Sequence, residues 1–290
     1  MMALLLINSA LFLYFQKDLN IDYDENAYQL SFSEYSYDLK APLSRWDLPR
    51  ELEEISGLSF YKRNQLACVQ DEDGDIFIYD LKKEAIERKE KFGPDGDYEG
   101  IEIVDDTVFV LKSNGDVFYF ELKRKGIGKV FEIKTDLTNK NDAEGLGFRV
   151  NENEVLIACK EAPGTKKVDV EKSRTVYRID NAEKKFKKKP RFIIDGENYK
   201  KMLEKKGFSK KKHRPFKPSG IAMHPDSKHL FVIGTVGKMM IILNSDSDIV
   251  DLVPLDPKIF WQPEGICFSP EGDLYISSEG RGGKGYILKF

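Results

Sequence analysis

The chain has 290 residues, of which 41% are hydrophobic and 33% are charged, with a net charge of -3 at neutral pH. This length allows a substantial core, either in one large all-β domain or in two ordinary domains. Because positive and negative charges nearly cancel, no overall field favours nucleic acid or an acidic partner, and we expect no specific nucleic-acid ligand.

The N-terminal run Ala3–Phe15 is nearly all apolar, but it is shorter than the roughly 20 residues that span a bilayer as a helix. No Lys or Arg precedes it, and neither a small-residue cleavage site nor a lipid-accepting cysteine follows it. Residues 1–20 are therefore open to three interpretations: a membrane anchor, a truncated signal, or an apolar segment docked on the fold. An uncleaved anchor fits best, and it predicts attachment to the cell membrane on its extracytoplasmic, periplasmic face.

Tyrosines and aliphatic residues alternate with polar residues from Ile21 to Pro42, as they do in a β-strand. The last repeat of the chain offers three strands and then stops. We expect the N-terminal strand to supply the missing one, so that the two ends of the chain close a ring and no sheet edge stays exposed. Trp46–Leu52 would then link this strand to the first full repeat.

Five copies of one short motif, here called the glycine phrase, organise the remaining sequence. Each copy is a polar residue, a glycine and an aliphatic residue, followed by alternating apolar runs and turns. The copies are Ser56-Gly57-Leu58, Glu99-Gly100-Ile101, Glu144-Gly145-Leu146, Ser219-Gly220-Ile221 and Glu264-Gly265-Ile266. Their glycines lie about 45 residues apart, except for a third gap of about 75, and such a period is typical of propellers. The sequence therefore predicts an all-β, five-bladed β-propeller over residues 21–290.

Hairpin turns support the register of these repeats. Asp73-Gly74 and Asn114-Gly115 occupy equivalent places in the first two repeats, and both dipeptides tolerate the positive φ angles of a type I′ turn. The third repeat is irregular, because it carries a lysine-rich insertion at about 181–216 that includes a predicted short helix at Tyr199–Lys206. Insertions in propellers lie on one face, so this one is either a solvated loop or a site for an anionic ligand.

Cysteines and histidines give little sign of catalysis. Cys68, Cys159 and Cys267 lie in or beside apolar runs without C-x-x-C spacing, and we interpret them as free buried thiols. His224 aligns with Ser269 of an evident turn in the last repeat, which predicts a turn histidine rather than a general base. No catalytic residue can be assigned from the sequence.

Glutamates open three of the five glycine phrases, and we call Glu99, Glu144 and Glu264 the hub glutamates. In a propeller the first strand of each blade lines the central axis, so these side chains are expected at the channel mouth. Serine opens the other two phrases, which means that the fold itself does not require a carboxylate there. Three ionised carboxylates about 5 Å apart would repel by about 3 kcal/mol per pair at an effective dielectric of about 20.

That repulsion must be offset by protonation, which raises the pKa values, or by a cation. Oxygen ligands without His or Cys favour calcium over magnesium, which requires tighter octahedral geometry. The hub glutamates are therefore the predicted calcium ligands, and the alternative is three solvated side chains that never meet. A second set of acids aligns at the ends of the second strands, as candidate outer groups or ligand contacts: Glu72, Glu161 and Glu279.

Five segments together resemble the SdiA-regulated protein family, over about Tyr28 to Phe290. They are Leu52–Leu58, Asp97–Ile101, Asp142–Phe148, Lys217–Phe231 and Gln262–Gly280. The resemblance implies a five-bladed propeller distantly similar to NHL-repeat propellers, a calcium ion at Glu99, Glu144 and Glu264, and an envelope location behind an N-terminal anchor. The lysine-rich insertion and the missing basic start depart from the family pattern. The family name implies no activity.

Two functions follow as expectations. The first is a calcium-binding module outside the cytoplasm that takes a protein or a small molecule at the propeller mouth. The second is a calcium-dependent hydrolase of phosphoesters or lactones, in which the metal activates water. We favour the binding module over the enzyme, because no histidine base or nucleophile motif accompanies the acids.

Overall fold

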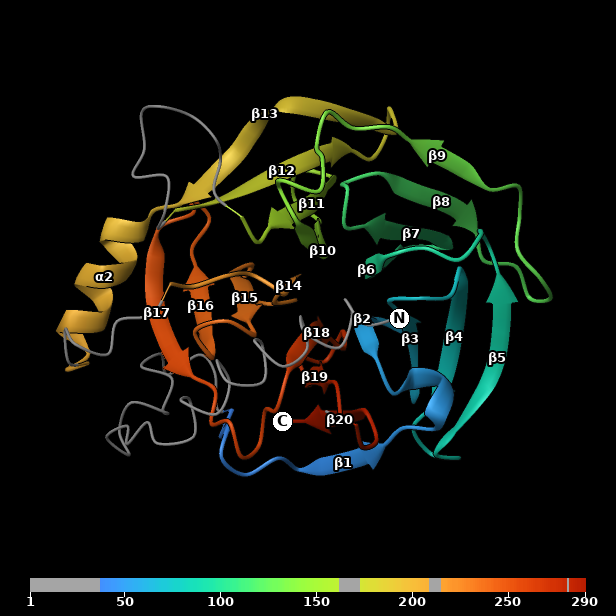
Figure 1. Cartoon of the computed structure of the whole chain (residues 1–290), viewed down its shortest axis with the longest axis horizontal. Coiled ribbons are helices and arrows are strands. Elements are labelled where there is room, and N and C mark those ends of the chain that lie inside the picture. Colours follow the sequence, from blue (N-terminus) through green and yellow to red (C-terminus); the bar gives the residue numbers. More distant parts are fainter. Residues whose placement is uncertain (1–36, 162–172, 209–214, 281) are drawn as a thin grey trace, which may run out of the picture.

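Five four-stranded antiparallel sheets form a ring around a central axis in the computed structural model (Figure 1). The structure describes residues 37–161, 173–208, 215–280 and 282–290. The predicted five-bladed propeller is confirmed. The apolar run Ala3–Phe15 and most of the predicted strand before Pro42 lie outside the described residues. Within the described ranges, no helix has the length and apolar character needed to cross a bilayer.

Each blade is described from the axis outward. Blade I contains β2 (Ile55–Lys62), β3 (Gln65–Gln70), β4 (Asp75–Asp80) and β5 (Ala85–Lys91), and blade II contains β6 (Tyr98–Val104), β7 (Thr107–Lys112), β8 (Val117–Glu121) and β9 (Phe131–Ile133). Blade III contains β10 (Ala143–Arg149), β11 (Glu154–Cys159), β12 (Arg174–Asp180) and β13 (Lys185–Ile194), and blade IV contains β14 (Gly220–Met223), β15 (Leu230–Gly234), β16 (Met239–Leu243) and β17 (Ile249–Pro254). Blade V contains β18 (Pro263–Phe268), β19 (Leu274–Ser278), β20 (Tyr286–Lys289) and β1 (Ser44–Asp47).

The two ends of the chain meet in blade V, as expected. Strand β1 runs antiparallel to β20, and the Leu43 N–H donates to the Lys289 carbonyl at 2.8 Å. The closing strand nevertheless lies just after Pro42, partly in the segment predicted to be a linker. Trp46 decides this position, because its ring packs against Tyr275 of the same blade and its Nε1 donates to the Leu81 carbonyl of blade I at 2.9 Å.

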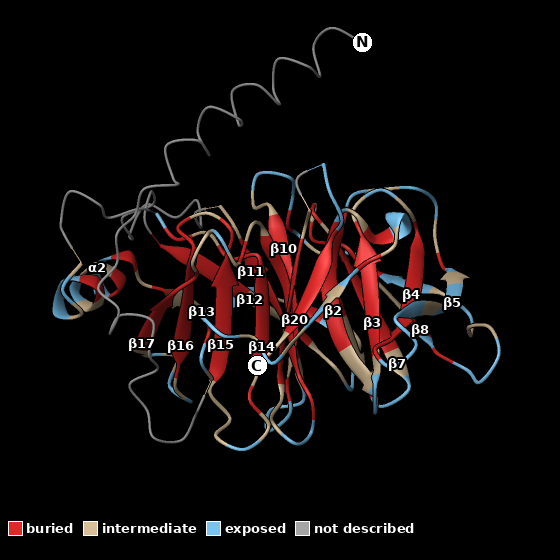
Figure 2. Cartoon of the chain, turned by 90° about the horizontal axis from the view of Figure 1, so that it is seen from below, coloured by how far each residue is buried: buried red, intermediate tan, exposed pale blue. Residues whose placement is uncertain are grey.

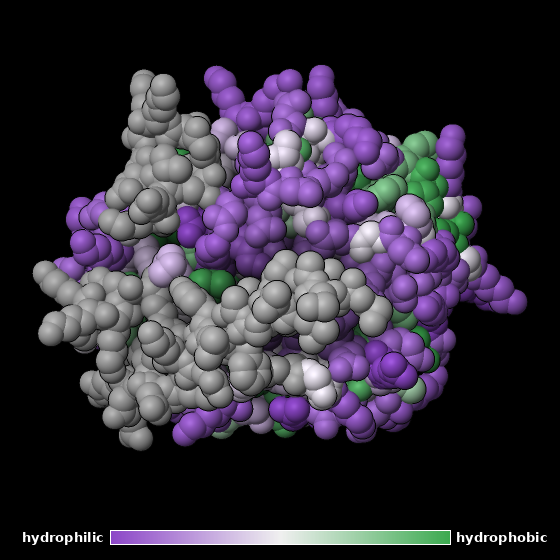
Figure 3. Space-filling view, in the orientation of Figure 1, coloured by the Kyte–Doolittle hydropathy of each residue, from purple (hydrophilic) through white to green (hydrophobic). Residues whose placement is uncertain are grey.

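Five apolar clusters fill the spaces between neighbouring blades, so that every blade packs against two others. The inner strands are buried along most of their length, while the loops at both ends and the outer strand β5 are largely exposed (Figure 2). Cys68, Cys159 and Cys267 are free thiols within this core, as predicted. On the face seen in Figure 3, the described surface is mainly hydrophilic.

The glycines of the glycine phrases let the inner strands approach closely around the axis. A Cβ added at Gly265 would lie 2.8 Å from the Leu58 amide nitrogen, and one at Gly57 would lie 2.8 Å from the Ile101 amide nitrogen. Real Cβ atoms essentially never come so close to backbone. The glycines are therefore what allows five strands to share one narrow channel.

Part of the lysine-rich stretch belongs to the regular fold. Its first lysines lie on the outer strand β13, where Lys188 Nζ is 2.8 Å from Asp136 and Lys187 pairs with Asp180 and Glu183. The predicted short helix is present as α2 (Gly196–Lys205), which begins at an N-cap where the Asp195 carboxylate accepts from the Asn198 N–H. Tyr199 and Leu203 of α2 pack into the cluster between blades III and IV. An anionic ligand at this stretch stays a prediction.

Candidate metal centre at the channel mouth

All five glycine phrases line a single cavity on the axis, here called the hub cavity. Glu99, Glu144 and Glu264 are among its lining residues, so the structure brings together three acids that are far apart in the sequence. The cavity has a volume of about 10 Å³, close to the smallest space that holds one water. A site of this size is suited to a single small species held by surrounding side chains.

Burial and mutual repulsion raise the pKa values of the hub glutamates. Glu144 and Glu264 are only 5% and 8% exposed. Burial and the charges of Glu144 and Glu264 raise the pKa of Glu99 to about 10, and burial raises the pKa of Glu144 to about 8. The pKa of Glu264 is raised as well, again because of burial. The hub therefore tends to take up protons or another positive charge at neutral pH.

Lys160 supplies positive charge to the hub, and the sequence reasoning missed it. Its Nζ lies 2.8 Å from Glu144 Oε1 at the end of β11, and its charge lowers the pKa values of Glu144 and Glu264 against the effect of burial. A signal was present, because Lys160 directly precedes Glu161 at the aligned ends of the second strands. Because successive side chains of a strand point to opposite faces, an alignment that is one residue off selects Glu161 in place of Lys160.

The second set of acids does not form one ring. Glu279 interacts electrostatically with Glu264, and burial together with that charge raises its pKa to about 9. Glu161 instead pairs with Lys217. Glu72 is exposed and lies in another pocket, beside Glu54. Of the three, Glu279 is thus the one that belongs to the electrostatics of the hub.

Asp71 is a further acidic group near the mouth that the alignment did not select. Its Oδ1 is buried and has no hydrogen-bond partner among the described residues. Burial and the charges of Glu54 and Glu72 raise its pKa to about 7. A buried carboxyl oxygen without a partner is costly, and it marks a place where a cation or a proton would be stabilising.

The two serine phrases also line the cavity, but their hydroxyl groups are used in contacts between blades. Ser56 Oγ donates to the Tyr98 carbonyl at 2.7 Å, and Ser219 Oγ donates to the Pro263 carbonyl at 2.6 Å. Each serine therefore ties its blade to the next one. The three glutamates that replace serine lose this kind of link and bring charge to the axis.

The chemistry of these donors fits a hard cation, although the side chains are not already gathered as ligands. Within the described ranges, no three or more His, Cys, Asp or Glu side chains are arranged to hold a metal ion. The side chains that line the hub cavity offer carboxylate oxygens and neither sulfur nor imidazole. Calcium prefers such oxygen ligands. A metal ion there would compete with the Lys160 ammonium for Glu144.

His224 lies where a turn was expected. Its Nδ1 accepts from the Asp226 N–H at 3.2 Å, and its Nε2 is 3.0 Å from the Tyr37 hydroxyl. These contacts hold the ring within the turn and against Phe231 and Phe268. The ring lies among the residues of another pocket and does not line the hub cavity.

Solved structures similar to this chain are remote from it in sequence. They include hydrazine synthase of Kuenenia stuttgartiensis, with 14% identity, a TM-score of 0.48, and coverage of 81% of this chain and 83% of that one. Virginiamycin B lyase of Staphylococcus aureus has 13% identity, a TM-score of 0.46, and coverage of 85% and 73%. A chain of a nidogen/laminin complex has 11% identity, a TM-score of 0.49, and coverage of 77% and 72%. No protein with a curated description matches the sequence significantly.

A family model covers most of the chain. The model described as SdiA-regulated matches residues 30–281, which include every glycine phrase and the closing strand β1. The match includes strands of all five blades and ends before β20. The chain therefore belongs to the SdiA-regulated family.

Proposed function

We propose that this protein is a calcium-binding β-propeller that acts as a binding module outside the cytoplasm. The observation that carries the proposal is the convergence of Glu99, Glu144 and Glu264, from three different blades, on one cavity of about 10 Å³. Burial raises the pKa values of all three, and the charge of Lys160 lowers those of Glu144 and Glu264 only in part. Glu279 and Asp71 add further carboxyl groups at the same mouth.

The hub glutamates would hold the calcium ion, and Glu279 and Asp71 would lie next to it. The ion would supply the positive charge that these buried carboxyls otherwise obtain from protons. Serine residues of the remaining phrases keep blades I and IV tied to their neighbours, so the cavity walls are rigid on those sides. A rigid, charged mouth is suited to holding a polar group of a protein or of a small molecule.

Titration calorimetry on chelator-treated protein tests the site. We expect a heat of binding when calcium is added to the wild type. Glu144→Gln should weaken calcium binding about tenfold or more, since a neutral amide replaces a charged metal ligand. Glu121→Gln is the matched control, because Glu121 is 63% exposed on an outer strand. Absence of heat and of any change in melting temperature with millimolar calcium would contradict the proposal.

The location outside the cytoplasm rests on the apolar run Ala3–Phe15. Expression of residues 1–290 and of residues 21–290, followed by membrane fractionation, tests it. We expect the longer chain in the membrane fraction and the shorter one in the soluble fraction, because only the longer chain carries the apolar run. Recovery of both chains in the soluble fraction would contradict an anchor.

Hydrolysis of a phosphoester or lactone is the second candidate, and the lysines at the mouth favour it. Lys160 forms an ion pair with Glu144, and Lys217 forms one with Glu161 nearby. Two ammonium groups are therefore close enough to the mouth to bind an anionic oxygen of a substrate. Generic phosphoester and lactone substrates, each assayed with calcium and with chelator, separate the two functions. Calcium-dependent turnover that Glu144→Gln abolishes would favour the enzyme, and binding without turnover would favour the module.

A further inference from the structure

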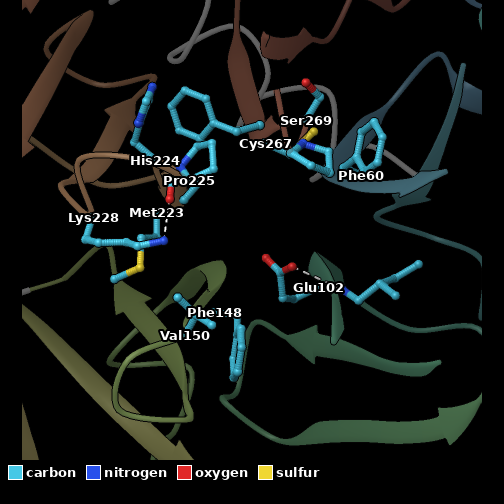
Figure 4. Close-up of a pocket in the computed structure, with 14 residues that line it drawn as sticks. Phe60, Glu102, Phe148, Val150, Met223, His224, Pro225, Lys228, Cys267 and Ser269 are labelled. Atoms are coloured by element: carbon cyan, nitrogen blue, oxygen red, sulfur yellow. Dashed lines mark hydrogen bonds between the residues drawn. The ribbon is translucent and has the colours of Figure 1, made fainter. Parts of the chain in front are cut away.

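A second and larger pocket lies at the other end of the central channel, and we call it the far pocket. Its volume is about 340 Å³, within the range of small-molecule sites. All five inner strands contribute to it near their C-terminal ends, at Phe60, Glu102, Phe148, Met223 and Phe268. Figure 4 shows side chains of this pocket around an open space. Most of its lining is apolar, in contrast to the hub cavity.

One position in the repeats distinguishes the far pocket. The residue two places after each phrase glycine is small in four blades, at Ser59, Gly147, Ala222 and Cys267, and it is Glu102 in the fifth. A small residue is therefore what the crowded axis requires, since a Cβ at Gly147 would lie 2.4 Å from the Ile221 carbonyl oxygen. Glu102 is the exception, and its carboxyl points into the pocket (Figure 4). Packing alone does not explain a carboxyl there.

The hydrogen bonds of Glu102 leave half of its carboxyl available. Oε1 accepts from Ser59 Oγ and from the Ile103 N–H, each at 3.2 Å. Oε2 has no hydrogen-bond partner among the described residues. Burial raises the pKa of Glu102 to about 8. Only hydrogen bonds from Ser59 and the Ile103 N–H act against this rise, and no positively charged group does.

The basic groups of the far pocket are already engaged. Lys228 lies on the wall opposite Glu102 (Figure 4), and its Nζ donates to the Pro225 carbonyl. His224 contacts the Tyr37 hydroxyl through Nε2. Neither group is among those that shift the pKa of Glu102. The carboxyl at the pocket wall therefore still lacks a cationic partner among the described residues that line this space.

We propose that the far pocket binds a small apolar amine, with its ammonium group on Glu102 and its hydrocarbon body against Phe60, Phe148 and Phe268. Aromatic faces attract a cation as well as apolar surface, and a charge-assisted hydrogen bond to a carboxylate is stronger than a neutral one. An acidic ligand would place a second negative charge beside Glu102. The pocket size limits the ligand to a small molecule of the dimensions of an arylalkylamine.

Calorimetric titration with 2-phenylethylamine tests this site, with 2-phenylethanol and 3-phenylpropanoate as ligands of similar shape. We expect the amine to bind about tenfold or more tightly than the alcohol, and the acid to bind more weakly than both. Glu102→Gln should remove the advantage of the amine over the alcohol. Phe148→Ala, at a partly exposed side chain, should weaken amine and alcohol alike.

Two matched controls isolate the effect. Glu121→Gln removes an exposed carboxyl and should leave amine binding unchanged. Glu144→Gln alters the hub cavity at the other end of the channel and should also leave it unchanged, so the calcium proposal can fail without this one. Absence of amine binding at millimolar concentration, equal binding of the three compounds, or unchanged binding in Glu102→Gln would each overturn the proposal.

Discussion

The two ends of the central channel are built from the same five strands, yet their chemistry is opposite. At one end three glutamates line a cavity with room for about one water, and at the other mostly apolar side chains enclose about 340 Å³. The glycine phrases lie at the first end, and the residues two to five places later lie at the second. The difference shows that the propeller fold requires small residues at certain positions near the axis, whereas a carboxyl at an equivalent position occurs in some blades and not in others.

The narrow part of the channel separates the two ends, and Gly265→Ala should disturb it most. The new Cβ would lie 2.6 Å from Leu58 Cβ and 2.8 Å from the Leu58 amide nitrogen. We expect a loss of about 3 kcal/mol in the free energy of unfolding, measured by urea denaturation. Gly145→Ala is the matched control, because its nearest contacts are 3.2 Å and 3.3 Å, and it should cost less. Equal losses would show that backbone approach is not the cause.

Lys160→Met removes the counter-charge from the acidic end alone. Because the Lys160 side chain is 25% exposed, we expect a loss of about 2 kcal/mol at pH 7, below the usual cost of breaking a fully buried pair. Calcium should recover most of this loss, and its affinity should rise, since no ammonium competes for Glu144. Lys188→Met breaks an exposed pair with Asp136 and should cost less than about 1 kcal/mol. Lower calcium affinity in Lys160→Met would contradict the competition.

The pH dependence of stability should differ with the state of the acidic end. Folding raises the pKa of Glu144 to about 8 and of Glu279 to about 9, so the folded protein binds more protons than the unfolded chain above pH 5. Stability is therefore highest at low pH and falls as the pH rises through these values. We expect the free energy of unfolding to fall by about 2 kcal/mol per pH unit between pH 6 and 8 in the presence of chelator, as measured by urea unfolding. Calcium should make the free energy of unfolding depend less on pH. The same pH dependence with calcium and with chelator would contradict the metal site.

Glu102→Gln tests the apolar end, with the smallest effect. The pKa of Glu102 is about 8 in the folded protein, so the wild-type carboxyl is mostly protonated at pH 6 and ionised at pH 9. The neutral amide should match the wild type at about pH 4, where the folded and unfolded carboxyls are both protonated, and should exceed it in stability increasingly as the pH rises, by about 1 kcal/mol or more at pH 9. Parallel pH profiles for the two proteins would show that Glu102 is solvated instead of enclosed.

Much of the architecture could be predicted from the spacing of the phrases. The glycines mark the first strand of every blade, because only a residue without a side chain allows the close approach seen at Gly57 and Gly265. Closure of the ring by the N-terminus was also predictable from the three strands at the end. Its position at Ser44–Asp47 was not, since it depends on the hydrogen bond from Trp46 to Leu81 in another blade.

The sequence by itself determined the period, the number of blades and the three acidic positions at the hub, because a repeat records what each blade needs at each position. Tertiary structure decided which charged groups meet. Lys160 reaches Glu144, Glu161 turns to Lys217, and Asp71 keeps a buried oxygen beside the mouth. Electrostatic partners are set by distances of a few ångströms within and between blades of the ring, and no repeat pattern encodes those distances.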